Sequence, residues 1–130
     1  MPIISTLISN MRKVVETLRV QQGDFTLAML YTADLEAESS WNFVVSAPWT
    51  DSKGVGEAIR IIAQALNQGL DLENQSAISR ITVLKTSDPF VQDMIRLYPT
   101  PPAGPISIQQ VMAGPIYEGS GFILSSQMVA

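Results

Sequence analysis

The sequence predicts an α+β protein in which three helices pack against a single mixed β-sheet of about five strands, in the order α-β-β-α-β-α-β-β. Apolar residues recur at helical spacing in three segments, and five shorter segments are rich in apolar and β-branched residues. The chain has 130 residues, of which 46% are hydrophobic and 15% are charged, a composition that suits one domain with one core. We therefore expect residues 1–130 to form a single α+β domain.

The first half of the chain begins with a helix over residues 3–20, and Gly23 is its expected stop. Residues 24–33 and 41–47 follow as two strands. They are joined by the polar segment DLEAESS, so the simplest arrangement is an antiparallel hairpin. Pro48 ends the second of these strands.

A second helix is predicted over residues 55–66, with Gly69 as its stop. The strand that follows, residues 78–85, completes a strand-helix-strand unit. Such a unit most simply places its two strands parallel to each other, as neighbours in one sheet. We therefore expect residues 78–85 to pair with residues 41–47.

A third, short helix starts with a clear signal, because Asp88 is a favourable N-cap and Pro89 suits the first helical position. Pro99 ends this helix, and the stiff segment TPPAGP follows it. Residues 106–113 and 121–126 are then predicted to form a terminal pair of strands, joined through the turn-rich segment GPIYEGS.

The chain contains no cysteine and no histidine. Disulfides, thiolate nucleophiles and catalytic triads that depend on imidazole are therefore excluded. Asp34, Glu36 and Glu38 lack the EF-hand pattern, and Gly119-Ser120-Gly121 lacks the context of a nucleophile elbow. We expect no metal ion and no cofactor, and a binding protein is favoured over an enzyme.

The formal net charge is −4, and it is unevenly distributed. Residues 1–22 carry three basic residues against one acidic residue, whereas residues 24–57 carry six acidic residues against one basic residue. Because nucleic-acid affinity depends on clustered Lys and Arg, we expect no nucleic-acid partner. No apolar run approaches the roughly 18 residues that a bilayer demands, so we expect a soluble, cytoplasmic protein without a membrane partner.

The strongest candidate for a ligand site is the connection before the second helix, which contains Trp49, Asp51, Lys53, Gly54 and Gly56. A glycine-containing loop that leads from a strand into a helix brings backbone amides and the positive helix end together, which favours anions. The third glycine of a dinucleotide fingerprint and the Gly-Lys-Ser/Thr of a P-loop are both missing. The structural alternative is that Asp51 or Ser52 caps the helix while Trp49 covers the edge of the core.

The terminal strands are the expected association surface, through Ile106, Ile108, Phe122, Ile123 and Leu124. These strands are apolar and carry few charges to prevent edge pairing. The leading hypothesis is therefore a non-catalytic protein-association module that forms a homodimer or a larger symmetric assembly, or that binds another protein. One alternative is a monomer in which the first helix covers these strands. Another is a binder of small ligands or anions, or an enzyme that uses carboxylates, with its site at residues 49–56.

Overall fold

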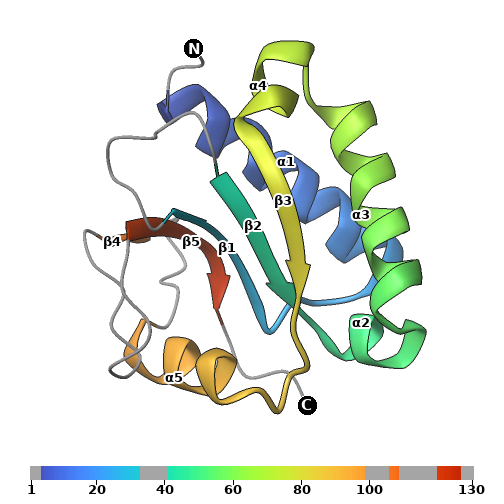
Figure 1. Ribbon diagram of the computed structural model, residues 1–130, viewed down its shortest axis with the longest axis vertical. Coiled ribbons are helices and arrows are strands. Elements are labelled where there is room, and N and C mark those ends of the chain that lie inside the picture. Colours follow the sequence, from blue (N-terminus) through green and yellow to red (C-terminus); the bar gives the residue numbers. More distant parts are fainter. Residues whose placement is uncertain (1–3, 33–40, 99–105, 109–119, 127–130) are drawn as a thin grey trace.

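The computed structural model describes residues 4–32, 41–98, 106–108 and 120–126. Helices lie on both faces of one mixed sheet, which confirms the α+β class (Figure 1). The strands are β1 (Leu27–Thr32), β2 (Trp41–Ser46), β3 (Ile78–Val83), β4 (Ile106–Ile108) and β5 (Ser120–Ser126). The helices are α1 (Ile4–Gln22), α2 (Pro48–Lys53), α3 (Val55–Gly69), α4 (Leu72–Ala77) and α5 (Pro89–Leu97).

The five strands lie in the order β3-β2-β1-β5-β4. β1 and β2 are antiparallel, as predicted, with Met29 opposite Val44. β2 and β3 are parallel neighbours, which confirms the predicted crossover. β5 pairs with both β1 and β4, so β3 and β4 occupy the two edges of the sheet.

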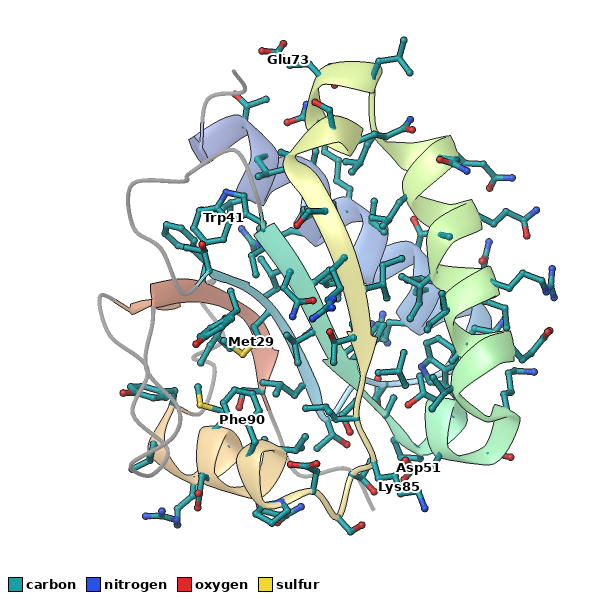
Figure 2. All side chains as sticks on the ribbon, viewed as in Figure 1. Met29, Trp41, Asp51, Glu73, Lys85 and Phe90 are labelled. Carbon is teal, nitrogen blue, oxygen red and sulfur yellow. The ribbon has the colours of Figure 1, made fainter. Side chains whose placement is uncertain are left out.

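Each face of the sheet has its own hydrophobic core, because side chains alternate between the faces along every strand. Ala28 and Leu30 of β1 pack with buried residues of α1 and α3, such as Leu7 and Ile62. Leu27 and Met29 face the other way and pack against α5. Figure 2 shows Met29 pointing toward Phe90 of α5 across this second core. The two-sided burial of β1 explains why its sequence is apolar at consecutive positions.

The two glycines expected as helix stops act in different ways. Gly23 follows the last residue of α1 with a φ of 132°, a conformation that favours glycine, so it ends the helix as predicted. Gly69 is the last residue of α3 and has no positive φ. A Cβ atom at Gly69 would lie 2.8 Å from Cγ2 of Val14, so this glycine is needed for the close approach of α3 to α1.

The prediction of three helices is wrong, because the described residues contain two more short ones. α2 occupies the expected loop after Pro48. Thr50 closes its first turn by accepting a hydrogen bond from the backbone amide of Ala47 at 3.0 Å and donating one to the Ala47 carbonyl at 2.9 Å. α4 replaces the expected polar connection and is capped by Asp71, whose Oδ1 accepts from the backbone amide of Asn74 at 2.8 Å.

The start of α5 is as predicted. Oδ1 of Asp88 accepts a hydrogen bond from the backbone amide of Phe90 at 2.8 Å, and Pro89 occupies the first turn. Of the terminal strands, β4 covers only the first three residues of the predicted segment 106–113. The rest of that segment and the connection at residues 114–119 lie outside the described residues.

Candidate functional site

The predicted ligand residues between Trp49 and Gly56 do not line a loop. They belong to α2, to the joint at Gly54 and to the first turn of α3. Gly54 has a φ of 87°, and its amide donates to the Thr50 carbonyl at 3.1 Å while its carbonyl accepts from the amide of Ala58 at 3.0 Å. One glycine therefore ends α2 and starts α3, and Gly56 lies beside it in open space.

Trp49 is a core residue, with 7% of its surface exposed. Its ring contacts Phe25 edge-on, with centroids 5.7 Å apart and planes at 74°. The buried Nε1 of Trp49 has no hydrogen-bond acceptor among the described residues. The position of Trp49 therefore fits the alternative that it covers the edge of the core, because its ring packs beneath α2.

Asp51 does not cap α3. Its Oδ1 accepts from the backbone amide of Thr86 at 3.1 Å, and its Oδ2 accepts from the Thr86 hydroxyl at 2.6 Å. Figure 2 shows Asp51 next to Lys85, at the start of the chain segment that leaves β3. The expectation that Asp51 or Ser52 caps the helix is wrong, since the N-cap is Gly54 without any side-chain bond. The hydrogen bonds of Asp51 instead connect α2 to the segment that follows β3.

Lys53 is the one predicted ligand residue that borders a large hollow among the described residues. This groove, of about 580 Å³, lies between α1 and α3. Its charged residues are Lys13, Lys53, Arg60 and Glu57, and its uncharged polar residues are Thr17, Gln21, Gln22, Gln64 and Gln68. We call it the α1–α3 groove.

The α1–α3 groove carries a net positive charge. Arg60 forms an ion pair with Glu57, in which Nε of Arg60 lies 3.0 Å from Oε2 of Glu57. This hydrogen bond lowers the pKa of Glu57 below its ordinary value, the charge of Lys53 adds to that effect, and the pKa of Arg60 rises. Lys13 and Lys53 form no ion pair with any described residue. The three basic residues and the one acidic residue of the groove therefore leave it a net charge of +2, and Glu57 lies near enough to Lys53 for the two charges to interact.

The helices α1, α2 and α3 carry more basic than acidic residues. Of the eight basic residues, five lie on α1, α2 or α3, namely Arg12, Lys13, Arg19, Lys53 and Arg60. The same helices hold only three acidic residues, Glu16, Asp51 and Glu57, in a chain whose net charge is −4. Of these five basic residues, Lys13, Lys53 and Arg60 line the α1–α3 groove, whereas Arg12 and Arg19 line a second hollow on α1.

The groove residues other than Lys53 were not predicted, although their spacing holds a signal. Lys13, Thr17 and Gln21 are four residues apart on α1, and Glu57, Arg60, Gln64 and Gln68 are three or four apart on α3. Each set forms one polar stripe on its helix. Only the packing of α1 beside α3 turns the two stripes into the walls of one groove.

The predicted association residues lie on the two terminal strands. Ile123 is fully buried against α5, and Leu124 is buried in the core beneath α1. Phe122 is half-buried and contacts the Trp41 ring, with centroids 5.6 Å apart. Ile106 and Ile108 belong to the edge strand β4. Ile123 and Leu124 therefore contribute to packing within one chain, and β4 is the part of this surface that lies at an edge.

The described residues contain no group of three or more acidic side chains placed to hold a metal ion. No helix in that part of the chain is long and apolar enough to cross a bilayer. No protein-family model, curated protein or solved structure matches this chain.

Proposed function

We propose that this protein is a non-catalytic association module that binds an acidic segment of a partner protein in the α1–α3 groove. The observation that supports the proposal most strongly is the pair of lysines, Lys13 and Lys53, that line this groove and form no ion pair with a described residue. Charged groups left at an open surface are well placed to steer and select an oppositely charged partner.

The length of the groove suits a chain segment. Its lining on α3 extends from Glu57 to Gly69, and at 1.5 Å per residue this is about 18 Å of helix. An extended segment of roughly five residues spans the same length. Lys13 lies toward the Gly69 end of the groove and Lys53 toward its Glu57 end, so carboxylates near the two ends of such a segment would meet the two lysines.

The uncharged lining suits a polypeptide as well. Four glutamine side chains and Thr17 border the groove, and each glutamine amide both donates and accepts hydrogen bonds. Backbone amides and carbonyls of a bound segment need partners of both kinds. The lining therefore supports a peptide ligand, with the lysines providing selection by charge.

A direct test is binding of a fluorescently labelled poly-glutamate peptide, with poly-lysine as the reference, measured by anisotropy at low ionic strength. We expect poly-glutamate to bind and poly-lysine not to bind. The double variant Lys13→Glu/Lys53→Glu should weaken poly-glutamate binding at least about tenfold, or about 1.4 kcal/mol. Raising the salt concentration should weaken binding by the wild type, because exposed charges are screened.

The matched control is Arg96→Glu, which makes the same change of charge at an exposed position on α5, far from the groove. The single variants Lys13→Glu and Lys53→Glu are compared with this control. If the control loses as much affinity for poly-glutamate as either of them, only the net charge matters and the proposed site is rejected. Circular dichroism of each variant verifies that the fold is retained. Absence of poly-glutamate binding by the wild type would also contradict the proposal.

A homo-oligomer through the terminal strands and a cytoplasmic location stay predictions from the sequence. The edge strand β4, with Ile106 and Ile108, is the element through which the predicted self-association would act. Light scattering coupled to size exclusion measures the mass in solution. A mass of one chain at micromolar concentration would contradict the homo-oligomer.

A further inference from the structure

The second edge of the sheet, β3, has backbone groups available for pairing. β3 ends the strand order, so no strand of the described residues lies on its outer side. The amide of Leu84 donates to the Val45 carbonyl of β2 at 2.9 Å. The backbone groups of Leu84 and of every second residue before it therefore point toward β2. Since amide and carbonyl groups alternate in direction along a strand, those of Ile81 and Val83 point away from β2, toward the open edge.

An apolar groove runs beside this edge. It has a volume of about 280 Å³ and lies between α3 and β3. Its apolar lining is formed by Ile59, Ala63, Leu66, Ile78 and Ile81. We call it the α3–β3 groove. An open strand edge beside a helix-lined apolar groove is the combination by which some domains add an extended peptide to a sheet, using main-chain bonds for affinity and side-chain pockets for specificity.

The charges on β3 and on the segment that leaves it indicate which occupant fits. From Ile78 to Lys85 the chain carries Arg80 and Lys85, both exposed, and no acidic residue. If a second copy paired through the same edge, the basic residues of both copies would lie along one seam, and like charges across strands are destabilising. Basic residues on an edge strand are also a common protection against self-pairing. The edge is therefore complementary to an acidic strand and not to itself.

We propose that the β3 edge receives an extended acidic segment of a partner protein as an added strand, with alternate apolar side chains of that segment in the α3–β3 groove. This surface lies on the other side of α3 from the α1–α3 groove, and it shares no lining residue with it. The test of this proposal is therefore independent of the test of the proposed function.

The probe for the test is a synthetic peptide of alternating valine and glutamate, and the readout is amide hydrogen exchange measured by NMR. In the free protein, the amides of Ile81 and Val83 should exchange fast and those of Thr82 and Leu84 slowly. Saturating peptide should slow exchange at Ile81 and Val83 at least about tenfold. A valine-lysine peptide should bind more weakly to the wild type, and Arg80→Glu should reverse this preference, whereas Arg96→Glu should not.

One variant blocks the β3 edge, and another blocks the α3–β3 groove. Val83→Pro removes a donor that points out of the sheet, which an edge strand tolerates, and it should abolish peptide protection of Ile81. Val83→Ala is its control, because it shortens the same side chain and keeps the donor. Ala63→Phe fills the α3–β3 groove from the helix side and should weaken peptide binding at least about tenfold without any change to the strand. Lys53→Glu should leave the protection of Ile81 and Val83 by the peptide unchanged, because Lys53 does not line the α3–β3 groove.

The proposal is overturned if the valine-glutamate peptide leaves exchange at Ile81 and Val83 unchanged in the wild type. It is also overturned if Val83→Pro and Ala63→Phe bind the peptide as well as the wild type does. A concentration-dependent dimer that Val83→Pro abolishes would assign the edge to a second copy and would likewise reject the acidic partner strand. If Val83→Pro fails to fold, Ala63→Phe decides the outcome alone.

Discussion

Asp51 and Gly69 owe their roles to residues far away in the chain. The hydrogen bonds of Asp51 join it to Thr86, 35 residues further along the chain. Gly69 is required because Val14 of α1 lies against it. From the sequence, Asp51 was predicted to bind a ligand or, as the alternative, to cap the helix, and Gly69 was predicted to be a stop, since local rules consider only the neighbouring residues. The burial of Trp49 was predictable because a large aromatic ring next to an apolar strand usually packs onto the core.

We expect Gly69→Ala to destabilise the protein by about 1 kcal/mol. The added methyl would lie 2.8 Å from Cγ2 of Val14, a buried β-branched side chain with few other rotamers, and this overpacking outweighs the better helix propensity of alanine. Gly56→Ala is the matched control, because no atom lies within 4 Å of the added methyl. It should stabilise the protein by about 0.5 to 1 kcal/mol. Thermal unfolding measures both changes, and equal effects of the two substitutions would refute the packing role of Gly69.

Among the helices, those long enough to repeat an apolar face several times were predictable from the sequence. The two shortest helices were not. α1 and α3 have 19 and 15 residues, enough for several repeats of an apolar face. α2 and α4 have six residues each, too few for the period to show. Their start signals, Pro48 and Asp71, were present but are equally common in turns. The start of α5 was predictable because Asp88 and Pro89 together form a stronger signal.

Asp88→Ala should destabilise the protein by about 1 kcal/mol through loss of the bond to the Phe90 amide. Asp88→Asn is the informative control, because asparagine caps helices about as well as aspartate and removes only the charge. Chemical denaturation should therefore place the asparagine variant close to the wild type. If both variants lose the same stability, the charge and not the cap is responsible.

Across the whole molecule, the arrangement of the helices creates properties that no single segment has. α1 and α3 lie side by side on one face of the sheet, and α5 lies on the other face (Figure 1). This arrangement joins two polar stripes into the α1–α3 groove and leaves β3 at an edge beside α3. The sequence predicted the α+β class and the parallel pairing of β2 and β3, but it contains no local signal for which helices become neighbours. The groove could therefore not be predicted, although one of its lysines was.

We propose that this protein meets an acidic partner in the α1–α3 groove. The most direct measurement is an NMR titration of the isotope-labelled protein with poly-glutamate. We expect saturable shifts of the amides around Lys13, Lys53 and Arg60, and we expect them to disappear in the Lys13→Glu/Lys53→Glu variant. Shifts confined to α5 or to the β3 edge, or no saturable shift at all, would contradict it.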